Sequence, residues 1–136
     1  MKIDGRCHCG QVTFEAEVDP ATAGICHCTD CQMLSGSAYR VSVRAAAQDF
    51  KLNGDVSSYI KTADSGNKRR HAFCSHCGTP IYATQPDGPT SYTLRVGTIR
   101  QRAALAPQRQ IFVHSAVPWS SDLSGVETLD LRILQR

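Results

Sequence analysis

Seven cysteines in three short clusters constrain this chain of 136 residues more than any other feature of its sequence. The clusters are Cys7 and Cys9, then Cys26, Cys28 and Cys31, and last Cys74 and Cys77. A disulfide framework usually has an even number of cysteines and an export signal, whereas this sequence starts without an apolar segment. Cysteines that only fill a hydrophobic core would be scattered along the chain. The clustering therefore favours metal binding in a reducing compartment and predicts a cytoplasmic protein.

The composition is that of one globular domain, which we expect to cover residues 1–136 as a single zinc-binding unit. Hydrophobic residues make up 41% and charged residues 20%, which argues against a disordered chain. No apolar run approaches the ~18–20 residues of a membrane span, so no membrane association is expected. The formal charge of +3 is mild and does not favour nucleic acid as a partner. The oligomeric state is left open.

Alternation of apolar and polar residues predicts a mainly β fold. The expected strands cover residues 11–18, 39–43, 56–61, 69–73, 79–84, 91–96 and 111–113, and Leu129, Leu131 and Ile133 alternate near the end. The strand at residues 111–113 is expected to be short and buried. Residues 44–49 are compatible with one or two helical turns, and residues 100–106 show a weak helical period. No segment shows a sustained helical period.

The number of cysteines suggests how they are divided between metal ions. A structural zinc has four protein ligands, whereas a catalytic zinc keeps one position open. In Cys74-x-x-Cys77 the two sulfurs can turn toward one ion. In Cys7-x-Cys9 the period of a strand would place both thiols on one face. Each pair is followed by a glycine, and together the pairs would make a closed site of four thiolates.

The middle cluster is left with three thiols for one ion. Cys26, Cys28 and Cys31 can converge from a single loop, and the fourth position would go to water, a substrate or a distant side chain. A rival pairing would join Cys28 and Cys31 to the last cysteine pair. That gap far exceeds the ~15–20 residues of a compact zinc ribbon, and the first pair would be left without partners.

The charge of the open site favours thiol chemistry. Three thiolates on Zn²⁺ carry about −1 in total, because ligating thiols are deprotonated. Such a zinc is a poor Lewis acid for activating water, and a soft thiol suits it better as a fourth ligand. Zinc binding would lower the pKa of that thiol and hold a thiolate ready to attack an electrophile.

The five histidines are weaker ligand candidates than the cysteines. His8 and His27 alternate with cysteines and are expected to point away from the metal, and His76 lies inside a turn. His71 and His114 could face the open site, although a surface or hydrogen-bonded histidine is the commoner role. No histidine is followed two residues later by glutamate, which argues against the zinc deaminase signature.

In sequence order, these motifs resemble those of the glutathione-dependent formaldehyde-activating enzyme family, which includes the centromere protein V relatives. The stretches that carry the resemblance are Gly5–Glu15, Cys26–Cys31 with Ser35–Ser37, Phe73–Tyr82, Val96–Ile99 and Pro118–Trp119. All seven cysteines fall in register with the family's motifs, and the resemblance covers nearly the whole chain.

The resemblance implies a β-tent-like fold of several small twisted antiparallel sheets built around two zinc sites. The implied ligands of the structural zinc are Cys7, Cys9, Cys74 and Cys77, and those of the second, open zinc are Cys26, Cys28 and Cys31. This agrees with the division suggested by the spacing. The resemblance also implies a carbon–sulfur lyase that reversibly adds glutathione to formaldehyde, giving S-hydroxymethylglutathione.

Two positions depart from the family's usual pattern. After Gly97-Thr98 the family usually continues Leu-Asp, where this chain has Ile99-Arg100. Gln110 stands where the family tends to carry a histidine. Both departures lie outside the zinc motifs, so the expected zinc ligands are unchanged, and the departures leave the identity of the substrate open.

More than one function is compatible with the sequence. The first is a zinc-dependent lyase for a thiol–aldehyde adduct, with its catalytic site at the open zinc of Cys26, Cys28 and Cys31 and a small thiol such as glutathione as partner. The cations that could hold the thiol's carboxylates, or could simply be solvated, are Arg40, Arg44, Lys68, Arg69 and Arg70. The second is a non-catalytic zinc module that binds protein or nucleic acid. The third is metal storage or redox sensing by the three-thiol loop.

Overall fold

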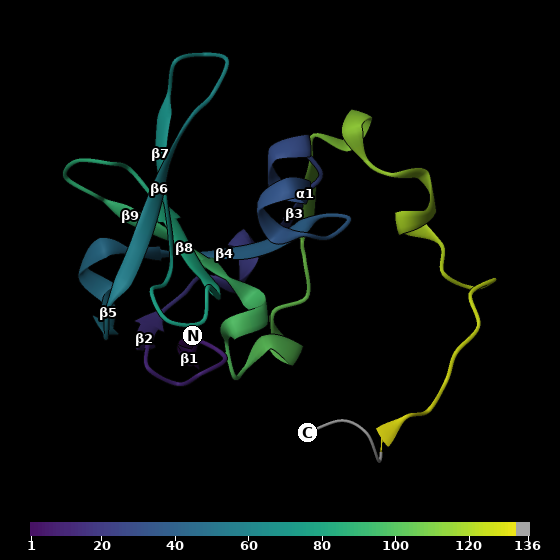
Figure 1. The fold of residues 1–136 in the computed structure, drawn as a ribbon, viewed down its shortest axis with the longest axis horizontal. Coiled ribbons are helices and arrows are strands. Elements are labelled where there is room, and N and C mark those ends of the chain that lie inside the picture. The colour runs from purple at the N-terminus through teal and green to yellow at the C-terminus, as the bar shows by residue number, and fades with distance from the viewer. Residues whose placement is uncertain (133–136) are drawn as a thin grey trace.

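The computed structural model describes residues 1–132 and is mainly β, as the alternation predicts (Figure 1). The strands are β1 (Lys2–Arg6), β2 (Thr13–Glu17), β3 (Gly24–Cys26), β4 (Arg40–Ala46), β5 (Phe50–Asn53), β6 (Val56–Thr62), β7 (Lys68–Cys74), β8 (Pro80–Thr84), β9 (Ser91–Arg95) and β10 (Arg109–Ile111). The helices are α1 (Thr29–Ser35) and the 3₁₀ turns η1 (Pro20–Thr22), η2 (Ala47–Asp49), η3 (Val96–Thr98), η4 (Arg102–Ala104), η5 (Val113–Ser115) and η6 (Pro118–Ser121). None of these helices has the length and apolar character needed to cross a membrane.

The strands form two sheets. The smaller is antiparallel and has the order β1-β2-β5. The larger has seven strands in the order β10-β3-β4-β9-β8-β7-β6. Its neighbours are antiparallel except for β10 and β3, which run parallel. The larger sheet is therefore mixed, in contrast to the wholly antiparallel arrangement expected from the sequence.

The larger sheet has one apolar face and one polar face, because successive side chains of a strand point to opposite sides. Cross-strand pairing aligns Val43 of β4, Leu94 of β9, Tyr82 of β8 and Ala72 of β7 on the apolar face. All four are buried and belong to the same core as the apolar residues of the small sheet. The apolar face is therefore covered by the core, and the polar face of the larger sheet is available to line a binding site.

The helix α1 was not predicted, because seven residues are too few for a helical period to be visible. Its ends nevertheless carry recognisable residues. The Cys28 sulfur caps the N-terminus by accepting a hydrogen bond from the Cys31 N–H at 3.3 Å. Gly36 ends the helix with a φ of 64°, in the left-handed region that favours glycine.

The segments expected to contain helical turns, residues 44–49 and 100–106, form one short 3₁₀ turn each. Residues 44–46 continue the strand β4, and only η2 forms a single 3₁₀ turn. In the second region only η4 is helical. Three alanines alone are a weak helix signal, and pairing with β9 outweighs it here.

The two strands predicted at the C-terminal end are wrong within the described residues. The strand β10 ends at Ile111, and Phe112 has a φ of 55° and is 52% exposed, so residues 111–113 are not a buried strand. Leu129 and Leu131 are exposed and lie in no strand, and Ile133 lies outside the described residues. Alternation is not sufficient for a strand where no neighbouring strand is available for pairing.

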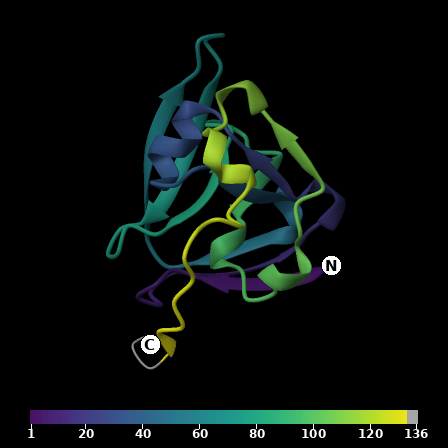
Figure 2. The same cartoon turned by 90° about the vertical axis from the view of Figure 1, so that its right-hand side faces the viewer.

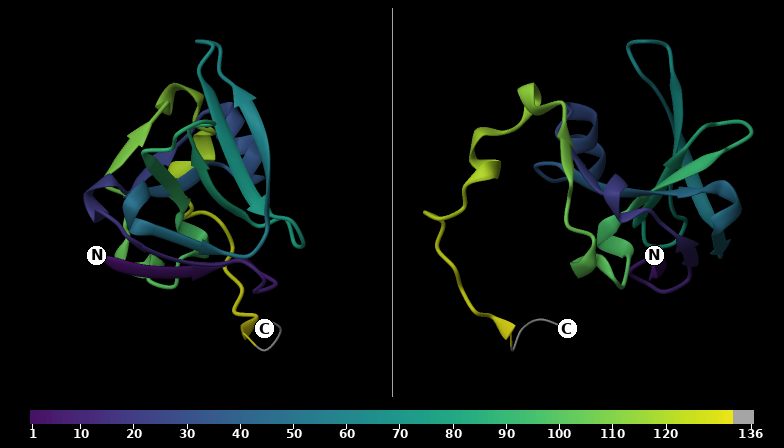
Figure 3. Two further views of the ribbon diagram at one scale, coloured as in Figure 1. Left: turned by 90° about the vertical axis from the view of Figure 1, so that its left-hand side faces the viewer. Right: turned by 180° about the vertical axis from the view of Figure 1, so that it is seen from behind.

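The segment after β10 leaves the body of the molecule. It lies beyond α1 and β3 and bends away from the two sheets (Figures 1 and 3). Figure 2 shows it from the side, in front of the sheets. One hydrogen bond fixes its first part, because Gln32 Nε2 of α1 donates to the Ser115 carbonyl oxygen at 3.0 Å.

Candidate functional site

The first and last cysteine pairs meet in one cluster. The sulfurs of Cys7, Cys9, Cys74 and Cys77 all lie within 4.8 Å of one another. Cys7 follows β1 and Cys74 ends β7, so the cluster joins the two sheets. Residues 8–10 form a turn, so the predicted strand at the first pair is wrong, and the turn brings its two thiols together.

The spacing of these sulfurs fits a metal and excludes a disulfide. Cys7 Sγ lies 3.5 Å from Cys9 Sγ, which lies 3.8 Å from Cys74 Sγ. A disulfide bond is about 2.05 Å long. A tetrahedral zinc with Zn–S bonds of about 2.3 Å would separate its sulfurs by about 3.8 Å. The four thiols therefore have the donor set and the spacing of a structural zinc site.

Backbone N–H groups and a hydroxyl surround these sulfurs. The Val12 N–H donates to Cys7 Sγ at 3.3 Å, and the Cys77 N–H donates to Cys74 Sγ at 3.4 Å. The hydrogen bond between Cys77 Sγ and Thr79 Oγ1, 3.1 Å long, is the main cause that lowers the pKa of Cys77 to about 5. Such donors favour the thiolate form that a metal requires.

The middle three cysteines form a separate cluster. Cys26 ends β3, Cys28 caps α1, and Cys31 lies in the first turn of that helix. Their sulfurs lie within 4.8 Å of one another, and no histidine or carboxylate among residues 1–132 joins the group. Burial would raise the pKa of Cys28, but hydrogen bonds with Cys31 and Cys26 outweigh it and lower that pKa. This set has three protein donors for one ion, one fewer than a closed tetrahedral site.

A cavity of about 290 Å³ opens beside these three thiols, on the polar face of the larger sheet. Strand register explains which side chains line it. Cys26 pairs with Arg40 across β3 and β4, and Ser42 pairs with Arg95 across β4 and β9. Six cations line the cavity: Arg40, Arg44, Lys61, Arg69, Arg95 and Arg109. No aspartate or glutamate among the described residues lines it.

Arg95 is held rigidly in this cavity. Its Nη1 donates to Ser42 Oγ at 3.0 Å, and its Nη2 donates to His71 Nδ1 at 3.2 Å. Burial, and then the neighbouring Arg40, lowers the pKa of Arg95 to about 9, so it remains a cation at pH 7. Because arginine can only donate, His71 Nδ1 must accept and the imidazole hydrogen lies on Nε2. Burial, followed by repulsion from Arg95, lowers the pKa of His71 to about 4, so this ring is neutral at pH 7.

Lys61 connects the cavity to the helix that carries the thiols. Its Nζ lies 2.9 Å from Oδ2 of Asp30, the residue before Cys31. Burial would lower the pKa of Lys61, but Asp30 and the thiols of Cys28 and Cys31 outweigh it and raise that pKa. The ion pair therefore links β6 to α1 at the edge of the cluster.

The cations named from the sequence separate into two groups. Arg40, Arg44 and Arg69 line the cavity. Lys68 and Arg70 do not; Arg70 Nη1 instead donates to Ser58 Oγ at 2.8 Å. Lys61, Arg95 and Arg109 also line the cavity, but the sequence alone did not indicate them as substrate-binding cations. No local motif marks them, because each reaches the cavity through strand pairing between distant segments.

His71 and His27 lie beside the three-thiol cluster but are not among its possible metal ligands. His71 lines the cavity, whereas His114 is not among the residues that line it. His27 is 4% exposed, and its ring lies with Nε2 2.7 Å from Gln110 Oε1. Gln110, which departs from the family's usual pattern, therefore supports the loop between Cys26 and Cys28 through its contact with the His27 side chain.

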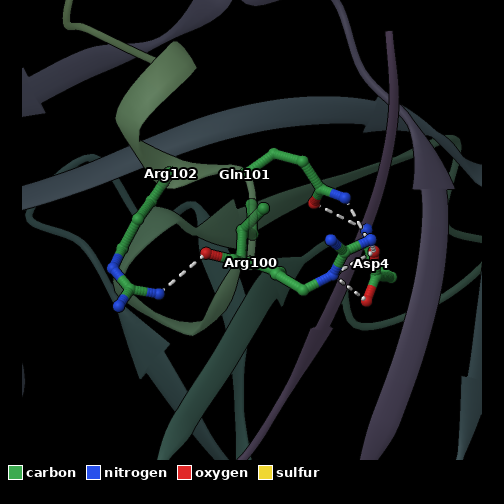
Figure 4. A network of polar contacts seen from close by, with 5 residues as sticks. Asp4, Arg100, Gln101 and Arg102 are labelled. Atoms are coloured by element: carbon green, nitrogen blue, oxygen red, sulfur yellow. Dashed lines mark hydrogen bonds and ion pairs between the residues drawn. The ribbon is translucent and has the colours of Figure 1, made fainter.

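The departure at Ile99-Arg100 lies elsewhere, against the first strand. Arg100 Nη2 lies 2.7 Å from Asp4 Oδ1, and Gln101 Nε2 donates to the same oxygen at 2.7 Å (Figure 4). The hydrogen bond with Arg100 is the main cause that lowers the pKa of Asp4. None of these three residues lines the cavity beside the thiols. Arg100, which departs from the family's usual pattern, thus binds the loop that follows η3 to β1.

The sequence profile of the family described as "Glutathione-dependent formaldehyde-activating enzyme" matches residues 2–115, which include both cysteine clusters. The chain belongs to this family. The family's name indicates an enzyme that acts on glutathione and formaldehyde.

The chain also resembles individual proteins, among them one relative and one solved structure. A Halomonas elongata relative that carries the family's name is 27% identical over 95 residues, which are 65% of this chain and 60% of the relative. The match thus spans less than two thirds of the relative's length. A crystal structure of a Rhodobacter sphaeroides protein superposes with a TM-score of 0.59 at 22% identity, covering 79% of this chain and 98% of that one. This second likeness shows a shared fold.

Proposed function

We propose that this protein is a zinc-dependent carbon–sulfur lyase that interconverts a thiol–aldehyde adduct, such as S-hydroxymethylglutathione, with the free thiol and aldehyde. The observation that carries the proposal is the contrast between the clusters. Four thiols form a closed set, and three open onto a cavity lined by cations. A thiol site beside a cationic cavity suits an anionic peptide thiol.

The metal complement of the proposal is two zinc ions per chain. Cys7, Cys9, Cys74 and Cys77 would hold a structural ion, and Cys26, Cys28 and Cys31 a second one. When bound by the three thiolates, zinc would supply a position for the substrate thiol and lower the pKa of that thiol. Reduced thiolates need a reducing compartment, so a cytoplasmic location is part of the proposal.

The cations of the cavity would bind and orient the substrate. Arg44 and Arg109 are exposed, and they suit the carboxylates at the ends of a peptide thiol. The neutral His71 can donate a hydrogen bond from Nε2 to the hydroxyl oxygen of the adduct without adding another positive charge. In the cleavage direction the hydroxyl proton passes by way of water to the departing sulfur, the carbon–oxygen double bond forms, and the carbon–sulfur bond breaks with its electrons going to sulfur.

The cavity argues against the alternative of a non-catalytic module for protein or nucleic acid. Arg40 and Arg95 are only 6% and 8% exposed. A nucleic-acid backbone or a protein surface contacts exposed cations and cannot reach guanidinium groups at such depth. The buried cations instead suit a small molecule that enters the cavity.

Cobalt substitution tests the proposal. Glutathione titrated into the cobalt-loaded protein should change the d–d bands and the sulfur-to-cobalt charge-transfer bands. S-methylglutathione is the matched control ligand, because it keeps both carboxylates but has no free thiol, and it should leave the bands unchanged. Cys28→Ser is the matched control variant. Spectra that do not respond to millimolar glutathione would contradict the proposal.

A further inference from the structure

Two buried arginines at the floor of the cavity lack a counter-charge. Arg40 and Arg95 are more than nine-tenths buried, and the Nε of each has no hydrogen-bond partner. None of the ion pairs found among residues 1–132 involves either side chain. A buried cation is costly unless a hydrogen-bonded anion accompanies it. The two guanidinium groups therefore point to an anion that the chain itself does not provide.

The three thiolates do not satisfy this need. With zinc they carry only about −1 in total. They lie close enough to attract Arg95, since Cys31 and Cys26 act to raise its pKa, but burial and Arg40 lower it more. Half-buried Arg69 adds a further positive charge to the same cavity, and no carboxylate lines it among the described residues. Positive charge remains in excess after the thiolates are counted.

The arginines that line the cavity differ in solvent exposure. Arg44 and Arg109 are exposed, whereas Arg40 and Arg95 are buried beside the thiol cluster. A peptide thiol carries its carboxylates at its two ends, several bonds away from its sulfur. Formaldehyde carries no charge at all. A buried pair of cations next to the sulfur site thus matches an oxyanion attached directly to the reacting carbon.

Arg95 is also preorganised for a carboxylate. Ser42 and His71 fix both terminal nitrogens of Arg95 and leave its Nε free. A planar guanidinium binds the two oxygens of a carboxylate through parallel hydrogen bonds. Little side-chain entropy is lost on binding when the donor is already held in place.

We propose that Arg40 and Arg95 form an oxyanion subsite, and that the preferred carbonyl substrate is an aldehyde bearing a carboxylate on the carbonyl carbon, of the 2-oxo acid class. The second part rests on the proposed lyase function. In the addition direction the thiol sulfur bonds to the aldehyde carbon, and the carbonyl oxygen takes the proton that the thiol gives up. The product is a 2-hydroxy-2-thioether acid. The carboxylate is unchanged and no oxidant or reductant is needed.

Binding of glycolate, an unreactive two-carbon carboxylate, tests the subsite in the absence of any thiol. Calorimetry on the zinc-loaded protein should show glycolate binding that weakens at least tenfold in Arg40→Met and in Arg95→Gln. Lys68→Gln, which removes an exposed cation that does not line the cavity, is the matched control and should bind glycolate as the wild type does. Arg40→Met keeps the length of the side chain without its charge, so we expect a folded protein at least as heat-stable as the wild type. Equal glycolate binding by all the proteins would overturn the subsite.

Turnover with two aldehydes of equal carbon number tests the substrate class. With glutathione, the wild type should favour glyoxylate over neutral glycolaldehyde in kcat/KM, and Arg95→Gln should reduce that preference at least tenfold. If glycolate binds through the arginines but glyoxylate is not preferred, the assignment of the carbonyl substrate is wrong. If glycolate binds through the arginines but the spectra of the cobalt-loaded protein do not respond to glutathione, the lyase proposal is wrong and the oxyanion subsite is still supported.

Discussion

The two cysteine clusters use the same ligand chemistry but hold the fold in different ways. The four-thiol cluster joins residues 65 positions apart, since Cys9 meets Cys74, and it connects the two sheets. The three-thiol cluster comes from six consecutive residues, Cys26–Cys31, where β3 leads into α1. A metal that closes a long loop removes more entropy from the unfolded chain than one that closes a short loop. We therefore propose that the four-thiol cluster serves stability and the three-thiol cluster serves chemistry.

The largest effect should come from opening the four-thiol cluster. Cys74 is 1% exposed and accepts backbone hydrogen bonds from His76 and Cys77. Structural zinc contributes folding free energy of about 10 kcal/mol or more, which is comparable to the whole stability of a domain. Cys74→Ser should therefore abolish cooperative thermal unfolding in circular dichroism. A sharp melting transition close to that of the wild type would show that this cluster does not hold the fold.

Opening the three-thiol cluster should remove zinc and activity but keep the fold. Cys28 caps α1, and serine is also a good N-cap, so Cys28→Ser preserves the start of the helix. We expect a folded protein with about half the zinc of the wild type, measured by mass spectrometry of metal content. Cys28→Ala loses the cap as well and should cost about 1 kcal/mol more. A Cys28→Ser protein as damaged as Cys74→Ser would show that the division of ligands is wrong.

A smaller effect should follow from removing the support behind the three-thiol loop. Gln110→Ala leaves the buried Nε2 of His27 without its partner, which costs about 1–3 kcal/mol of unfolding free energy in urea. Chelator competition should then release zinc more readily from the three-thiol cluster and leave the other cluster unchanged. Gln108→Ala is the matched control, because the Gln108 side chain donates only to the Ala106 carbonyl oxygen and the substitution keeps the backbone hydrogen bond from Gln108 N–H to the Ala23 carbonyl oxygen. Equal effects of the two substitutions would remove Gln110 from the support of the loop.

The smallest effect should come from the exposed contact between Arg100 and Asp4, which lies in neither cluster. Folding lowers the pKa of Asp4 from 3.8, so this contact stabilises the fold above pH 3.8 and its contribution is lost as the pH falls below that value. Arg100→Gln should lower the melting temperature slightly at pH 7, leave zinc content unchanged, and have no effect when Asp4 is already replaced by Asn. An effect of Arg100→Gln that persists in the Asp4→Asn protein would mean that Arg100 acts through something other than Asp4.

Local sequence patterns predicted most of the central strands and the grouping of the thiols, but missed β1, β5 and α1 and did not predict the cavity. The alternation of apolar and polar residues correctly predicted the central strands, because neighbouring strands are present to pair with their backbones, as at β2 and β7. The spacing within each cluster, with one or two residues between neighbouring cysteines, together with the total of seven cysteines predicted the two groups of sulfurs that the structure shows. The wall of the cavity depends instead on register between distant strands, as in the pairing of Ser42 with Arg95. A one-residue shift would turn those side chains to the other face, and no short motif records the register.

We propose that one cluster is saturated by protein thiols and that the other receives a thiol from outside. Selenium K-edge absorption distinguishes the two clusters, with reduced selenoglutathione added to the zinc-loaded protein. We expect a zinc atom in the first shell of selenium in the wild type and none in Cys28→Ser. Selenium without a zinc neighbour in the wild type, or with the same neighbour in both proteins, would contradict it.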